Sequence, residues 1–191
     1  MKTLRLNSKL NFLIILSILI MLGSCRAMSE QIKDESAGMN GGFEVSQKGI
    51  PVNWWIYSPN TVPDADFKIV LDTVIYKEGK QSLRFDVVRC FSTGGWASPG
   101  IHSEFFISGS YNGPATYKLS LWIKNDGAKF KINAGGVEGN IPTLIEEKEQ
   151  ISDWKLLEYH IDIPKDKRLR FELNILEPGT FWVDDIQIKK E

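Results

Sequence analysis

The chain has 191 residues, 42% of them hydrophobic and 25% charged, with a formal net charge of −1. This length suits one domain with a substantial core. The near balance of charge, without a basic cluster, argues against a nucleic-acid partner and against electrostatic binding to an anionic membrane.

The first 24 residues have the pattern of a secretory signal. Three basic side chains, Lys2, Arg5 and Lys9, precede a nearly unbroken apolar run over residues 12–22. The run is shorter than the roughly 20 apolar residues that a membrane-spanning helix needs, and small residues follow it. A positive start, a short apolar run and small residues are typical of a cleaved leader, so we predict that residues 1–24 are a signal peptide.

The end of this leader, Leu22-Gly23-Ser24-Cys25, resembles a bacterial lipobox. The resemblance implies that the chain is cut before Cys25 and that its thiol carries lipid, which anchors the protein in a bilayer of the cell envelope, at the outer membrane or the cell surface. Several acyl chains on one cysteine bind firmly, whereas a single chain binds only marginally. An ordinary signal peptide with an incidental cysteine is the alternative. With Cys25 lipidated, Cys90 has no disulfide partner in the chain.

The mature chain then begins with a predicted flexible tether at residues 25–40. This segment is polar, mixed in charge and nearly free of large apolar side chains, so it cannot bury enough surface to fold alone. Such a tether lets the domain that follows stand away from the membrane. Residues 25–191 contain 20 basic and 24 acidic side chains, a net charge of −4 that again argues against binding to nucleic acid.

From Phe43 onward the pattern is that of β-strands. Apolar and polar residues alternate with a period of two, and clusters of Gly, Pro, Asn and Asp separate the runs. Each alternating strand has one core face and one wet face. We therefore predict an all-β domain over residues 41–191, a two-sheet antiparallel β-sandwich or jelly roll of roughly eight to ten strands. Residues 145–154 lack an apolar stripe and are predicted to form a polar loop or short turn.

Five motifs in a fixed order carry a resemblance to a known family. They are Asn40-Gly41-Gly42-Phe43-Glu44, Gly49-Ile50-Pro51-Val52-Asn53-Trp54, Gly79-Lys80-Gln81-Ser82-Leu83, Tyr117-Lys118-Leu119-Ser120-Leu121-Trp122-Ile123-Lys124 and Phe181-Trp182-Val183-Asp184-Asp185-Ile186. The set resembles the carbohydrate-binding modules of the family 4, 9 and 22 group, which are jelly rolls with the galactose-binding-like fold. The resemblance covers about residues 40–189, and it implies a fold more specifically than a ligand, because one fold hosts many functions.

The resemblance also implies a structural calcium ion. In the family, the residues that match Glu44 and Asp184 help to bind calcium, and carbonyl oxygens near the turn at Lys80 complete the site. Calcium takes about six to eight oxygen ligands, which paired carboxylates and carbonyls supply. Asp184 alternates in step with Trp182 and Ile186, so we expect it to point inward, where a carboxylate needs a partner or a metal. Two surface acids without a metal are the alternative.

Aromatic rings away from the core are the candidates for binding a sugar, because flat rings pack against its C–H faces while polar side chains fix its hydroxyls. Trp54 is interpreted as core packing, so its neighbour Trp55 faces the other way. Trp96 lies in a glycine-rich loop, where a large ring has little packing role. The alternative is that each ring belongs to the core or its edge. The predicted ligand residues are Trp55, Tyr57, Trp96, Trp122, Glu172 and Asn174, with Lys118 and Ser120 as further polar neighbours on the same sheet face.

The function predicted from these features is non-catalytic carbohydrate binding by a lipid-anchored protein of the cell envelope, with a glycan and the lipid bilayer as partners. One alternative is a protein that acts with glycoside hydrolases or weakly hydrolyses glycosyl bonds. That chemistry needs two carboxylates at a set separation, and no spacing in the sequence singles out such a pair. A second alternative is a surface scaffold or adhesion protein that binds another protein.

Overall fold

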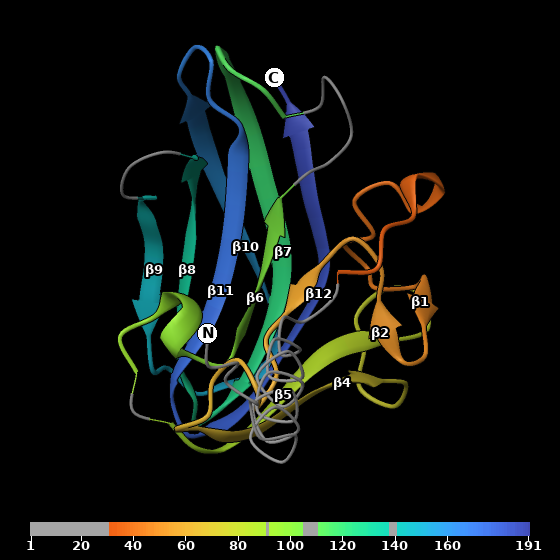
Figure 1. Ribbon diagram of the computed structural model, residues 1–191, viewed down its shortest axis with the longest axis vertical. Helices are drawn as coiled ribbons and strands as arrows, with labels where there is room; N and C mark the ends of the chain where they lie inside the picture. Colours follow the sequence, from red (N-terminus) through yellow and green to blue (C-terminus); the bar gives the residue numbers. More distant parts are fainter. Residues whose placement is uncertain (1–30, 91, 105–110, 138–140) are drawn as a thin grey trace, which may run out of the picture.

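The computed structural model describes residues 31–90, 92–104, 111–137 and 141–191 (Figure 1). The predicted signal peptide and Cys25 lie outside the described residues. Within the described ranges the regular structure is almost entirely β, with two short 3-10 turns, η1 (Glu35–Ala37) and η2 (Gly95–Ala97), and no α-helix. Consistent with this, the described residues contain no helix that is both long and apolar enough to span a membrane.

The first of the two large sheets has five strands in the order β10–β7–β12–β5–β4. Every neighbouring pair in it is antiparallel. Its long strand β7 carries the strict alternation seen in the sequence. The strands are β4 (Asp66–Asp72), β5 (Ser82–Arg89), β7 (Ala115–Asp126), β10 (Ile151–Ile163) and β12 (Gly179–Lys190).

The second large sheet also has five strands, in the order β3–β6–β11–β8–β9, and is antiparallel throughout. Its strands are β3 (Trp55–Ile56), β6 (Gly100–Glu104), β8 (Lys129–Gly136), β9 (Thr143–Glu147) and β11 (Leu169–Glu177). A small hairpin of β1 (Ser46–Gln47) and β2 (Ile50–Pro51) lies beside the sandwich (Figure 1).

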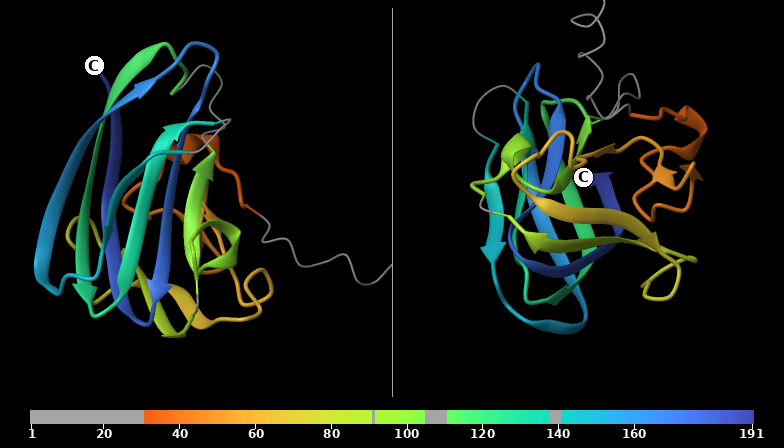
Figure 2. Two further views of the ribbon diagram at one scale, coloured as in Figure 1. Left: turned by 90° about the vertical axis from the view of Figure 1, so that its left-hand side faces the viewer. Right: turned by 60° about the horizontal axis from the view of Figure 1, so that its bottom comes forward.

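The two large sheets pack face to face, and the core lies between them (Figure 2). Alternate residues of the long strands are buried there because side chains in a strand point to opposite faces in turn. The predicted all-β, two-sheet antiparallel β-sandwich is therefore confirmed. Representative core residues are Leu83 and Phe85 of β5, Leu119, Leu121 and Ile123 of β7, and Phe171, Leu173 and Ile175 of β11.

The interpretation of residues 145–154 as a polar loop was wrong for most of the segment. β9 continues to Glu147 and β10 begins at Ile151, so only residues 148–150 connect them. β9 is an edge strand that pairs with β8 alone, opposite Ile132 and its neighbours. Backbone hydrogen bonds hold an edge strand without an apolar stripe, so its composition did not reveal it.

The described part of the predicted tether, residues 31–40, is packed against the domain. The side chain of Asn53 donates to the carbonyl oxygens of Asp34 and Gly38 and accepts the amide of Asp34. The buried side chain of Asn40 makes three hydrogen bonds to the backbone of Val45 and Val52. Polar side chains that satisfy backbone groups hold this segment, and Met39 packs against the core, so a flexible tether does not include residues 31–40.

Candidate functional site

A row of side chains crosses all five strands on the outer face of the second sheet. Trp55 of β3 lies opposite His102 of β6, His102 opposite Glu172 of β11, Glu172 opposite Asn133 of β8, and Asn133 opposite Thr143 of β9. Residues directly opposite each other in a sheet point to the same face. The intervening residues of these strands point into the core, so this row faces away from the first sheet.

This face is hollowed into a groove with a volume of about 710 Å³. Its floor combines two cationic side chains with a carboxylate and an amide, and an aromatic ring stands at its side. Such a mixture provides hydrogen-bond donors and acceptors together with a flat apolar surface. The lining residues are Trp96, Lys131, Asn133, Ile141, Pro142, Thr143, Arg170 and Glu172.

The ring of Trp96 is the exposed part of a small aromatic stack. Trp96 lies on η2, which Figure 1 shows as a yellow-green coil beside β11, and it is 53% exposed. Its ring stacks on Tyr57 with centroids 4.9 Å apart and 23° between the planes. The edge of His102 contacts the Trp96 ring at the same centroid distance, and Trp55 stacks on His102 at 5.8 Å. The stack therefore presents one flat ring to solvent and supports it from beneath.

Burial determines the charge of the groups beneath Trp96. Desolvation, with a smaller effect from the nearby Arg170 guanidinium, lowers the pKa of His102 to about 3, so the imidazole is neutral. Burial and then the negative charge of Glu172 raise the pKa of Tyr57, which keeps its hydroxyl protonated. The Tyr57 hydroxyl and His102 Nδ1 lie 2.9 Å apart and share a hydrogen bond. The two groups beneath Trp96, Tyr57 and His102, are thus neutral and hydrogen-bonded to each other.

Two ion pairs hold charged side chains at the groove. Arg170 Nη2 and Glu172 Oε1 are 2.7 Å apart, and both side chains are mostly buried. The two residues lie on the same face of β11, two positions apart. Lys131 of β8 ion-pairs with Glu146 of β9 at 3.5 Å. These pairs hold charged groups at fixed positions facing the groove, where they can bind hydroxyls without a large change in conformation.

The predicted ligand residues fall into three groups. Trp96 and Glu172 line the groove, and Trp55 lies on the same sheet face beside it. Tyr57 and Asn174 are at the same place but are fully buried, so the expectation that they are exposed to a ligand was wrong. Tyr57 lies beneath Trp96, and Asn174 binds the backbone that carries it.

Trp122 does not belong to this group. It lies on β7 of the first sheet, opposite Asp184, where the Lys77 ammonium group sits 4.3 Å from the centre of its ring. The polar neighbours Lys118 and Ser120 are on β7 as well, so they share no sheet face with Glu172. Alternation identifies the wet face of each strand but does not say to which sheet the strand belongs, and this is why the prediction failed.

Several residues of the groove were missed by sequence reasoning. Arg170 had a usable signal, because it alternates in step with Glu172 and Asn174 along β11. The others gave no such signal. His102 lies in a short strand without a clear alternation, and only the sheet order brings Lys131 and Asn133 to the same face. Their grouping depends on pairing between distant segments, which a sequence pattern does not show.

The predicted calcium residues meet at one loop, residues 73–81, between β4 and β5. Asp184 Oδ2 accepts the amides of Lys77 and Glu78 at 2.7 and 3.0 Å. Glu44 Oε1 accepts the amides of Lys80 and Gln81 at 2.9 and 3.2 Å. Gly79 has φ of +68°, a conformation that favours glycine, and a Cβ there would lie 2.3 Å from Glu44 Oε1 and displace that side chain. The two carboxylates therefore fasten the loop together.

In this structure, backbone amides of the loop donate to both carboxylates of the predicted calcium site. Lys80 contributes its amide to Glu44, whereas the prediction expected carbonyl oxygens near this turn to complete the oxygen ligands of the ion. No group of three or more His, Cys, Asp or Glu side chains that could hold a metal occurs in the described part of the chain. A calcium ion here stays a prediction that no observation on this chain tests.

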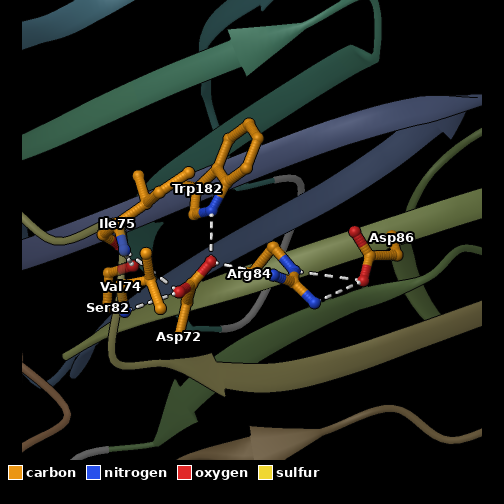
Figure 3. A network of polar contacts seen from close by, with 7 residues as sticks. All are labelled: Asp72, Val74, Ile75, Ser82, Arg84, Asp86 and Trp182. Atoms are coloured by element: carbon orange, nitrogen blue, oxygen red, sulfur yellow. Dashed lines mark hydrogen bonds and ion pairs between the residues drawn. The ribbon is translucent and has the colours of Figure 1, made fainter.

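The expectation that the Asp184 side chain points into the core is wrong. Asp184 and Trp182 lie on the outer face of the first sheet and are buried because the 73–81 loop covers them, while a register shift after Asp184 turns Ile186 into the core. Burial raises the pKa of Asp184 even though three backbone amides donate to it. The same loop is fastened at its start by Asp72 in a network that Figure 3 shows.

Fold and groove together define a two-sheet β-sandwich module with a candidate binding face on one sheet. No family model matches the chain, and no curated protein matches its sequence. Solved structures do match. The C-terminal family 22 carbohydrate binding module of Clostridium thermocellum Xyn10B is 16% identical, with 78% of this chain and 90% of that chain covered and a TM-score of 0.56. TmCBM61 in complex with β-1,4-galactotriose is 16% identical, with 80% and 96% covered and a TM-score of 0.51.

A third match is part of a larger enzyme. The CBM22-1-GH10 modules of the Clostridium thermocellum xylanase Xyn10B, complexed with xylohexaose, are 18% identical with a TM-score of 0.51. The likeness covers 65% of this chain but only 25% of that one. At these identities the likeness establishes the fold, so the chain has the β-sandwich fold of carbohydrate-binding modules, as the sequence resemblance implied.

Proposed function

We propose that this domain binds a poly- or oligosaccharide in the groove on its second sheet and breaks no bond in it. The observation that carries the proposal is Trp96, a half-exposed ring that is held flat on a buried tyrosine beside a floor of charged and amide groups. A sugar ring has an apolar C–H face and a rim of hydroxyls, so it matches a ring beside fixed donors and acceptors. The ligands named for two structural neighbours, β-1,4-galactotriose and xylohexaose, are carbohydrates, which supports this ligand class.

The composition of the groove favours capture over hydrolysis. Glycoside hydrolysis requires two carboxyl groups on opposite sides of the bond. Among the described residues that line the groove, Glu172 is the only carboxylate, and it is paired with Arg170. Stacking on one ring with a few hydrogen bonds gives modest affinity, with Kd in the micromolar to millimolar range, or roughly −8 to −4 kcal/mol. Many copies on one surface act together and compensate for weak single sites.

Two tryptophan variants provide the test. Soluble xylan, β-1,4-galactan and β-1,4-glucan are screened by affinity electrophoresis, and the best ligand is measured by calorimetry. We expect Trp96→Ala to weaken binding at least tenfold, about 1.4 kcal/mol. Trp122→Ala removes the same ring from the opposite side of the sandwich and should leave Kd unchanged. Both variants should keep a melting temperature close to that of the wild type.

Three results would contradict the proposal. Failure of the wild type to bind any glycan favours a scaffold or adhesion role, for which protein partners would be sought. Equal losses of glycan affinity in both variants would show that the binding site is not the groove. Shortening of a polysaccharide by the purified protein would show hydrolysis and would direct the search to a second carboxylate.

We further propose that lipid on Cys25 holds the domain at a membrane of the cell envelope, where it captures glycan. The support is the leader and the lipobox resemblance in the sequence. Replacing the thiol in Cys25→Ser removes the acceptor for lipid, so we expect soluble protein or an unprocessed precursor when cells are fractionated. Membrane association of a processed Cys25→Ser chain would contradict the anchor.

A further inference from the structure

Asn174, a buried side chain of the neighbouring strand β11, binds the turn that carries Trp96, and the buried Ser98 Oγ accepts the amide of Gly94 at 2.8 Å at the end of the same turn. Asn174 Oδ1 accepts the amide of Gly95 at 3.0 Å, and Asn174 Nδ2 donates to the carbonyl oxygen of Gly95 at 3.2 Å. Opposed residues of antiparallel strands exchange the same two kinds of bond. The Asn174 side chain therefore pairs with the backbone of Gly95 as a neighbouring strand would. Gly95 directly precedes Trp96 in the chain.

The surrounding chain makes room for this amide. Asn174 lies opposite Gly100 of β6, and a Cβ at Gly100 would lie 2.5 Å from Asn174 Nδ2. Gly95 has φ of +60°, a conformation that favours glycine. Asn174 itself has no exposed surface. Its oxygen and nitrogen both bind Gly95, and its burial prevents contact with a molecule in the groove.

The underside of Trp96 is fixed as well. Its ring rests on Tyr57, whose hydroxyl is hydrogen-bonded to His102, and both of these residues are buried. Asn174 thus fixes the backbone of the turn, and Tyr57 fixes the plane of the ring. Both constraints are made by groups of the protein itself.

We propose that Asn174 is a positioning residue, which orders the Trp96 turn over the groove before a ligand arrives and does not contact the ligand itself. The proposal rests on the proposed function of the groove. A platform that is already ordered loses less conformational entropy on binding than a mobile one, so its order contributes to affinity. Asn174 therefore acts on affinity only through Trp96.

Asn174→Leu tests this role, because leucine fills a similar volume and makes neither hydrogen bond. We expect glycan affinity to fall about fivefold or more and exchange of the Gly95 amide with solvent deuterium to accelerate in the free protein. The matched control is Asn125→Leu. Asn125 is equally buried and holds another turn in the same way, accepting the amide of Ala128 at 3.2 Å and donating to its carbonyl at 2.9 Å. Its loss should destabilise the fold but leave Kd unchanged.

A double-mutant cycle separates positioning from a general structural effect. If Asn174 acts through Trp96, adding Asn174→Leu to Trp96→Ala causes no further loss of affinity. Additive losses, or an unchanged affinity in Asn174→Leu, would overturn the positioning role while the glycan-binding function stands. If the wild type binds no glycan, the proposed function fails, but exchange of the Gly95 amide still tests whether Asn174 orders the turn. An unchanged exchange rate in Asn174→Leu would show that this side chain does not order it.

Discussion

Replacing Asp72 with asparagine is expected to lower the free energy of unfolding by about 3 kcal/mol. Asp72 is buried at the end of β4, and its carboxylate accepts four hydrogen bonds (Figure 3). Oδ1 accepts the amides of Val74 and Ile75, and Oδ2 accepts Arg84 Nη1 at 2.9 Å and Trp182 Nε1 at 3.0 Å. An asparagine NH₂ group cannot accept these bonds, so buried donors lose their partner. Urea unfolding monitored by tryptophan fluorescence measures the change.

Asp86→Asn is the matched control for Asp72→Asn, because Asp86 binds the same arginine. Arg84 and Asp86 are 3.0 Å apart, but both side chains are about one-third exposed. Exposed ion pairs contribute little, since water solvates the charges equally well when they separate. We expect Asp86→Asn to change the free energy of unfolding by less than about 1 kcal/mol. Similar losses in the two variants would show that the buried network does not hold the 73–81 loop.

The stability difference between wild type and Asp72→Asn should depend on pH. Burial alone would raise the pKa of Asp72, but hydrogen bonds from Trp182, the two loop amides and Arg84 outweigh it and lower the pKa to about 2. The carboxylate therefore contributes stability above its unfolded pKa of about 3.9, and this contribution is lost as the pH falls through 2. A difference between the two proteins that stays constant between about pH 5 and pH 2 would contradict the lowered pKa. Other carboxylates, present in both proteins, cancel in the difference.

The sequence predicted the sandwich because its core strands follow a local rule. Leu83 and Phe85, or Leu119 and Leu121, are separated by one residue that faces solvent or a covering loop, and that spacing is visible without any tertiary information. The fold class depends only on such spacing. Edge segments such as β9 depend on hydrogen bonds to a neighbour, and the sequence did not reveal them.

The candidate site was predicted less completely because it depends on which strands become neighbours. Trp55, Trp96 and Glu172 were identified singly, yet Trp122 has the same local pattern and lies on the other sheet. Asn174 was placed on the correct face but was predicted to contact a ligand, whereas it is buried and binds Gly95. A sequence does not distinguish a buried amide of this kind from an exposed one. The sheet order, which brings β11 between β6 and β8, decides these cases.

Replacing Trp54 with alanine is expected to lower the free energy of unfolding by about 4 kcal/mol. Trp54 precedes Trp55 in the chain but points into the core, where it has no exposed surface. Its ring packs against Phe43 at 5.5 Å and edge-on against Phe171 at 5.9 Å, and its indole Nε1 donates to the carbonyl oxygen of Asn40 at 3.0 Å. Removing the ring leaves a large cavity and takes away one of the two donors to the Asn40 carbonyl oxygen, which keeps only its hydrogen bond from the Phe43 amide. Denaturant unfolding measures the loss.

Two further variants keep this prediction testable if Trp54→Ala fails to fold. Trp54→Phe retains much of the packing and loses the bond to Asn40, so we expect a loss of about 2 kcal/mol. Trp96→Ala removes a ring that is half exposed, and we expect it to cost about 1 kcal/mol or less, since little surface leaves the core. Stability and binding should thus separate between the two rings: Trp54 variants lower stability, whereas Trp96→Ala lowers glycan affinity. A Trp96→Ala protein that is destabilised as much as Trp54→Phe would place both rings in the core and would remove the platform from the groove.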